Sequence, residues 1–236
     1  MTDAELAALV RRADPDRFIG ALFAPSAARR WLLTLYTFNH ELARAREVAS
    51  SAPLALIRLH WWREVVEGAV REHPVARLVQ EAIAAGAVEA TALVALIDAR
   101  EAEAEPIAGR DEFLSYVRGT AGGLARVAGG CLGVEDDEGL RRLDDLGTGY
   151  AIVAILRNHD ALAARGRVVM PADGDDFAAV AAGLLGARPP RRGIAAALPA
   201  VLARRDLARL RAGAPVRPRT LGDRLAVIGA GLTGRM

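Results

Sequence analysis

Lysine is absent from this sequence, cysteine occurs once, aromatic residues make up only 5%, and there is no long hydrophobic run. The single cysteine, Cys131, excludes an internal disulfide and favours a reducing compartment. Its apolar, glycine-rich surroundings indicate a packed thiol and not a nucleophile. No stretch approaches the roughly 20 uninterrupted apolar residues of a membrane span, and the acidic start, residues 1–6, is unlike a signal peptide. We therefore predict a cytoplasmic protein, and we interpret the exclusive use of arginine as a compositional bias of the source genome.

The residues that are abundant predict an all-α protein. Of the 236 residues, 52% are hydrophobic and 25% are charged, as in soluble globular proteins, and the length suits one domain over 1–236. Alanine, leucine and arginine dominate, while extended β-branched runs are scarce. Ser26 and Asp111 are the expected N-caps of their helices. With prolines at the joints, we predict helices over residues 3–12, 26–48, 53–68, 74–85, 89–105, 111–129, 137–164, 177–185 and 193–212, and a weaker helix after 220.

Positive charge is concentrated near the C-terminus. The net charge is only +2, but residues 188–236 contain eleven arginines and two aspartates, a local excess of 11 − 2 = +9. This basic helical region is either a solvated surface or a face for anionic lipid or for an acidic protein partner. It lacks interleaved aromatic residues and any recognisable binding motif, so we expect no nucleic acid as a partner.

Two of the predicted helices place small and polar residues on one face. In the helix over 26–48, spacings of three and four residues align Tyr36, Asn39, Ala43 and Glu47. An aromatic residue such as Tyr36 most often packs in a core, but the polar residues beside it indicate a cavity. The helix over 137–164 aligns Gly147, Ala151, Ala154 and Asn158. Close helix packing is the default interpretation of these small residues, and room for a ligand is the alternative.

Four motifs resemble the squalene/phytoene synthase family in order and in spacing. They are Tyr36–Glu47, Trp61–Glu64, Asp111–Gly122 with its aromatic Tyr116, and Ile155–Arg157 continuing through Arg165-Gly-Arg167 to Pro171. Together they cover about residues 16–172. The resemblance implies an isoprenoid-synthase-like helical bundle with a central cavity. It also implies a family whose active members join two prenyl diphosphates with the help of Mg²⁺.

The positions that this resemblance assigns to magnesium binding have lost most of their carboxylates. Mg²⁺ needs oxygen ligands, and pairs of aspartates four residues apart on two helices can supply them. Here the first set falls on Ala43, Arg44 and Glu47, and the second on Asn158 and Leu162. Only Glu47 keeps a carboxylate. We therefore predict no metal site, no cofactor and no metal-dependent prenyl transfer; Mg²⁺ would be a cofactor only if the chain were an active synthase.

Three arginines match positions that help to hold phosphate in active members. These are Arg157, Arg165 and Arg167, and arginine can bind phosphate bidentately without a metal. The structural alternative is that Arg157 pairs with a nearby acid while Arg165-Gly-Arg167 closes its helix. The full set of candidate cavity or anion-binding residues is Tyr36, Asn39, Glu47, Tyr116, Arg157, Asn158, Arg165 and Arg167. No residue is assigned a catalytic role.

A retained fold, lost aspartates and an Arg-Gly-Arg segment together resemble one branch of the family, the assembly factors of respiratory complex I. Residues 38–43 also fit that branch. The resemblance implies a non-catalytic helper that binds a complex I subunit or assembly partner, peripherally on the cytoplasmic face of the inner membrane. Two alternatives stay open: a squalene- or phytoene-type synthase, which is a transferase, and a metal-independent binder of an isoprenoid or lipid.

Overall fold

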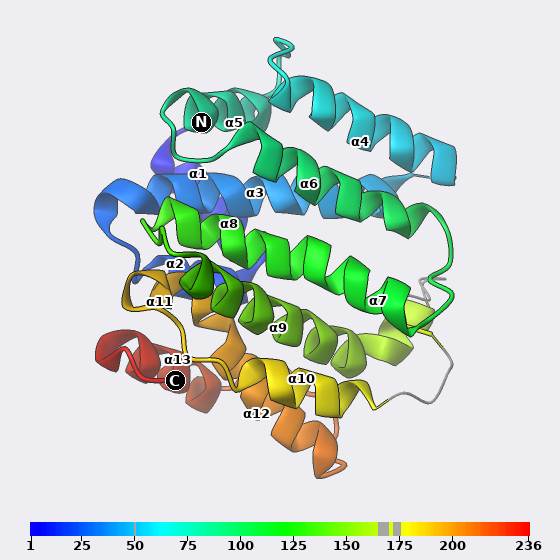
Figure 1. Cartoon of the computed structure of the whole chain (residues 1–236), viewed down its shortest axis with the longest axis vertical. Helices are drawn as coiled ribbons and strands as arrows, with labels where there is room; N and C mark the ends of the chain where they lie inside the picture. Colours follow the sequence, from blue (N-terminus) through cyan, green and yellow to red (C-terminus); the bar gives the residue numbers. More distant parts are fainter. Residues whose placement is uncertain (50, 165–169, 172–175) are drawn as a thin grey trace.

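The computed structural model describes residues 1–49, 51–164, 170–171 and 176–236, and no β-strand occurs among them. Most of the longer helices run side by side in successive layers (Figure 1). The first six are α1 (Asp3–Ala13), α2 (Pro15–Ala21), α3 (Ser26–Val48), α4 (Ala52–Val66), α5 (Pro74–Ala84) and α6 (Ala90–Glu101). The others are α7 (Arg110–Val117), α8 (Gly123–Cys131), α9 (Asp137–Ala163), α10 (Phe177–Leu185), α11 (Ile194–Ala197), α12 (Pro199–Arg211) and α13 (Leu221–Thr233).

Several predicted helix ends need correction. The prediction omitted α2, which begins because the Asp14 side chain accepts the backbone N–H of Arg17 at 3.0 Å and Pro15 takes the first helical position. The predicted helix over 193–212 is two helices, and α12 begins at Pro199, which has no N–H to continue α11. The helix predicted over 89–105 ends at residue 101 and continues as a short 3₁₀ turn over Ala102–Ala104.

Both predicted N-caps are wrong. Pro25 occupies the cap position of α3, and Gly109 that of α7; neither makes a side-chain capping bond. Ser26 and Asp111 therefore lie inside the first turns of their helices. An acidic residue in the first turn still interacts favourably with the helix dipole, so Asp111 helps its helix from a different position than the one predicted.

The helix predicted over 111–129 is one helical run that contains a π-helical turn, Arg118–Gly122, between α7 and α8. This turn packs directly on α9. A Cβ atom at Gly122 would lie 2.4 Å from Thr148 Oγ1, and one at Gly147 would lie 2.4 Å from the carbonyl oxygen of Ala121. The small residue Gly147 of α9 therefore allows close helix packing, as the default interpretation predicts.

The helix α9 packs against α8, α10 and α12 and lies near the centre of the bundle. The main core is built from large side chains that are almost fully buried, among them Phe38, Phe113, Ile97, Leu143 and Ile152. A second, smaller cluster joins α12 and the residue before it to α13, and it consists of Leu198, Leu202, Val227 and Ala230. Among the described residues, no helix combines the length and the apolar character that a membrane crossing requires.

Candidate functional site

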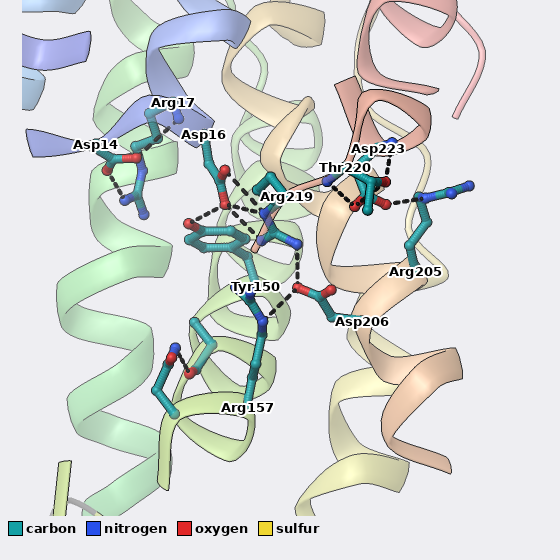
Figure 2. Close-up of polar contacts among 12 residues, drawn as sticks. Asp14, Asp16, Arg17, Tyr150, Arg157, Arg205, Asp206, Arg219, Thr220 and Asp223 are labelled. Atoms are coloured by element: carbon teal, nitrogen blue, oxygen red, sulfur yellow. Dashed lines mark hydrogen bonds and ion pairs between the residues drawn. The ribbon is translucent and has the colours of Figure 1, made fainter. Parts of the chain in front are cut away.

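Arg157 lies in a network of charged groups that connects α9 with the C-terminal helices (Figure 2). Its Nη2 donates to the backbone carbonyl of Arg217 at 2.5 Å, and its Nε lies 3.7 Å from Oδ2 of Asp206 on α12. Asp206 is buried and also accepts hydrogen bonds from Arg209 and Arg219. Arg157 thus pairs with an acid, as the structural interpretation predicts, and its use as an anion ligand stays a prediction.

The same network continues to the N-terminal part of the chain through Arg219. The Nη2 of Arg219 donates to Asp16 Oδ2 on α2 at 2.7 Å, and the hydroxyl of Tyr150 on α9 lies 3.4 Å from the same oxygen. Figure 2 shows Asp16, Arg219, Asp206 and Arg157 as a continuous chain of contacts. These groups lie on four different parts of the bundle, so the network fixes the segment after α12 against the rest of the protein.

A neighbouring part of the network surrounds Asp223, which is fully buried at the start of α13. Burial alone would raise the pKa of its carboxyl group. Hydrogen bonds from Arg209, from the backbone of Thr220 and from Arg205 outweigh burial and bring this pKa well below its ordinary value. Asp223 therefore carries a charge at neutral pH, and this charge holds α12 and α13 together.

A second polar cluster lies inside the bundle and contains two of the predicted site residues, Asn39 and Tyr116. The carboxylate of Glu103 accepts hydrogen bonds from the Tyr116 hydroxyl at 2.7 Å and from Arg100 Nη1 at 2.6 Å. Arg100 Nη2 also donates to Asn39 Oδ1 at 3.1 Å. Burial alone would lower the pKa of the Arg100 guanidinium, but the Glu103 carboxylate raises it above its ordinary value. The structure thus joins Asn39 and Tyr116 through a buried ion pair.

Sequence reasoning missed both members of that ion pair. Arg100 in the last turn of α6 and Glu103 in the 3₁₀ turn that follows are three residues apart, a spacing that permits an ion pair. Their neighbours Glu101 and Glu105 are also charged, so the segment resembles a solvated helix face. Only the tertiary contacts to Asn39 and Tyr116 distinguish Arg100 and Glu103 from ordinary surface charges.

The remaining candidates are more dispersed. Tyr36 is buried in the main core, where burial raises the pKa of its phenol. Glu47 lies in the exposed last turn of α3. Asn158 is exposed on α9, and its Nδ2 donates to the backbone carbonyl of Ala154 at 2.8 Å. Arg165 and Arg167 lie outside the described residues.

The donor atoms at the expected magnesium positions do not fit a diphosphate–magnesium cluster. Ala43 and Leu162 have no side-chain donor at all, and Arg44 is a cation whose Nη1 lies 3.5 Å from the Glu41 carboxylate. Glu47 alone offers a carboxylate, whereas Mg²⁺ prefers several hard oxygen ligands in octahedral geometry. In the part of the chain that the structure describes, no group of three or more His, Cys, Asp and Glu side chains is arranged to hold a metal ion.

The only thiol in the chain does not supply an alternative reactive centre. Cys131 Sγ donates to the carbonyl oxygen of Ala87 at 3.3 Å. Burial raises the pKa of the Cys131 thiol to about 12. Because the thiolate is the nucleophilic form, this cysteine stays protonated and unreactive at neutral pH, as expected for a packed thiol.

Solved structures with the same arrangement of helices define the class of fold. A dehydrosqualene synthase in complex with a ligand superposes with a TM-score of 0.79 over 98% of this chain and 95% of its own, at 12% sequence identity. The squalene synthase HpnC from Alicyclobacillus acidocaldarius superposes with a TM-score of 0.61 over 98% of this chain and 89% of its own, at 22% identity. At such low identities these similarities establish an all-α isoprenoid-synthase-like fold and nothing about activity.

The family follows from the sequence profile of squalene/phytoene synthases, which matches residues 10–176. Because this match covers well over half of the chain, the protein belongs to the squalene/phytoene synthase family.

Among curated proteins, the relatives are named NADH dehydrogenase (ubiquinone) complex I, assembly factor 6. The mouse protein is 28% identical over 171 residues, which are 70% of this chain and 51% of the relative. The human protein is 26% identical over 178 residues, which are 73% and 54%. This chain therefore spans about half the length of the curated relatives that it matches.

Proposed function

We propose that this chain is a non-catalytic member of its family that assists the assembly of respiratory complex I. The observation that carries the proposal is the loss of magnesium ligands from two separate helices, at Ala43 on α3 and at Leu162 on α9. The departing diphosphate of a prenyl transfer needs metal-held charge compensation, which these positions cannot supply. The names of the curated relatives support the assembly role.

The internal charge networks support a structural role for the arginines that they contain. Arg157, Arg219 and Arg100 each have a carboxylate partner within the protein. These ion pairs connect segments of the bundle, which favours a structural role for the three arginines over phosphate binding. In our proposal, the fold supplies a rigid helical body whose surface contacts a complex I subunit or assembly partner, with no bound cofactor.

We also propose that the protein works in the cytoplasm at the inner membrane surface. Of the arginines in the basic C-terminal region, Arg205, Arg209 and Arg219 are held in ion pairs. Others, including Arg188, Arg217 and Arg224, are exposed. The exposed arginines give that end of the molecule a positive surface suited to anionic lipids.

Two experiments test the proposal separately. The first incubates the purified protein with Mg²⁺ and farnesyl or geranylgeranyl diphosphate. We expect no squalene- or phytoene-length product, and clear turnover would overturn the non-catalytic reading.

The second experiment deletes the gene in the source organism and separates solubilised membrane complexes on a native gel. We expect fully assembled complex I to decline and partial assemblies to accumulate, and a complementing gene to reverse both effects. A normal amount of assembled complex I after deletion would overturn the assembly role.

A further inference from the structure

The last helix, α13, has apolar residues on two opposite faces. One face is buried, where Val227 and Ala230 belong to the second core cluster together with Leu198 and Leu202. Positions separated by three or four residues share a helix face, and the outward face of α13 carries four large apolar side chains at such spacings. Their exposed fractions are 72% for Leu221, 56% for Leu225, 39% for Ile228 and 76% for Leu232.

The outward stripe of α13 is continuous with an apolar groove beside α2. The groove has a volume of about 520 Å³, within the range of roughly 300–1,000 Å³ that is typical of small-molecule sites. Its apolar walls come from Phe18, Ile19, Leu22, Phe23, Leu202 and Ile228. Because Ile228 belongs to both the stripe and the groove, the two form one apolar surface, which we call the α13 surface.

Two arginines without an ion pair among the described residues border the α13 surface. Arg11 and Arg224 line the groove, are exposed, and have no ion pair among the described residues. The acidic groups nearest the groove are already neutralised, since Asp16 pairs with Arg219 and Asp223 with Arg205 and Arg209. The α13 surface is therefore apolar with a net positive rim.

We propose that the α13 surface docks on an anionic lipid bilayer. Exposed apolar side chains on a helix, with arginines beside them, suit the interface of an anionic membrane. The outward leucines enter the acyl region, the groove accepts one acyl chain of a phospholipid, and Arg11 and Arg224 contact phosphate groups. This inference deepens the membrane part of the proposed function and does not depend on the assembly role.

Flotation of the 236-residue protein with lipid vesicles tests the proposal. The vesicles contain either phosphatidylcholine alone or phosphatidylcholine with about one-third phosphatidylglycerol. We expect binding to the anionic vesicles that weakens as salt is raised, and binding about tenfold weaker for the Leu225→Gln/Leu232→Gln double variant. The matched control is Leu54→Gln/Ile57→Gln on α4, whose side chains are 46% and 63% exposed; this variant should bind like the wild type.

A depth-sensitive label gives a readout that does not rely on weakened variants. Leu225→Cys is introduced together with Cys131→Ala, so that an environment-sensitive fluorophore has one thiol to label. Anionic vesicles should shift the emission of this label to the blue and leave that of a label at Ile57→Cys unchanged. Failure of the wild type to float, or equal loss of binding in both double variants, would overturn the proposal. A label at 225 that responds only to a soluble protein would assign the surface to a protein partner and would also overturn it. None of these outcomes depends on the complex I phenotype.

Discussion

Arg219 donates to the carboxylate of Asp16 at 2.7 Å, although the two residues are 203 positions apart in the sequence. Asp16 lies on α2, within the residues that match the family, while Arg219 lies beyond them, between α12 and α13. Arg219 also pairs with the buried Asp206. One arginine therefore holds the C-terminal part of the chain against the family core.

Replacing this arginine should loosen the C-terminal segment. Arg219→Met leaves Asp16 and Asp206 without their shared cation, and we expect the free energy of unfolding to fall by about 3 kcal/mol. Urea denaturation measures that loss, and limited proteolysis should cut sooner between α12 and α13. Arg224→Met is the control, because Arg224 is exposed and has no ion pair among the described residues; it should change stability by less than about 0.5 kcal/mol. Equal effects of the two substitutions would contradict the role of Arg219.

The buried ion pair between Arg100 and Glu103 should behave differently from a surface pair. Arg100→Met leaves the Glu103 carboxylate without its cation, and we expect a loss of about 3–5 kcal/mol by urea denaturation. Adding Glu103→Leu should recover part of that loss, because the double variant no longer contains a buried carboxylate without a partner. As a control, Arg126→Met breaks an exposed pair with Asp137 and should cost less than about 1 kcal/mol. A double variant no more stable than Arg100→Met would contradict this account.

Replacing two glycines in neighbouring helices by alanine should change the free energy of unfolding in opposite directions. Gly147→Ala places a Cβ atom against the backbone of the π-helical turn, and we expect a loss of about 1–3 kcal/mol from overpacking. Gly130 in α8 has no atom within 4 Å of such a Cβ. Gly130→Ala should therefore stabilise the protein by about 0.5–1 kcal/mol, because glycine is a poor helix former. Thermal and urea unfolding of both variants measure the two changes in stability. A Gly147→Ala variant more stable than the wild type would contradict the close contact with the π-helical turn.

The charge on Asp223 should make stability depend on pH in acid. Its pKa in the folded protein is lower than the ordinary value of 3.8, so the ionised carboxylate stabilises the fold. This contribution is fully present above the unfolded pKa and is lost as the pH falls through the folded value. Asp223→Asn should thus be less stable than the wild type at pH 7, and the difference should shrink below about pH 4. Urea unfolding across this range measures it; a difference that grows in acid would contradict the assignment.

Local sequence signals predicted the all-α fold and many of the helices well. The helices α3 and α10 begin and end where the apolar periodicity and the neighbouring prolines predict. The omitted α2 is short, and its cap depends on the particular geometry of Asp14. The π-helical turn at Arg118–Gly122 depends on how closely α9 approaches, which no local pattern encodes.

The polar networks could be predicted only in part. The motifs identified Asn39, Tyr116 and Arg157 as unusual positions, and the structure places each of them in a network. Their partners Arg100, Glu103 and Asp206 come from segments far away in the sequence or from runs of charge that resemble a solvated surface. The exposure of the outward leucines of α13 could not be predicted either, because a helix with apolar residues on two faces resembles a buried helix in sequence.

In the proposed function, the chain supports complex I assembly without metal-dependent chemistry. The most direct measurement is the rate of NADH-driven quinone reduction in membranes of a strain that lacks the gene, with succinate-driven quinone reduction as the internal control. We predict that the NADH-driven rate falls while the succinate-driven rate is unchanged. The wild-type gene and a variant with Glu47→Gln, which removes the last carboxylate at the former magnesium positions, should restore it equally. An NADH-driven rate that is normal in the deletion strain, or that only the chain with Glu47 restores, would contradict the account.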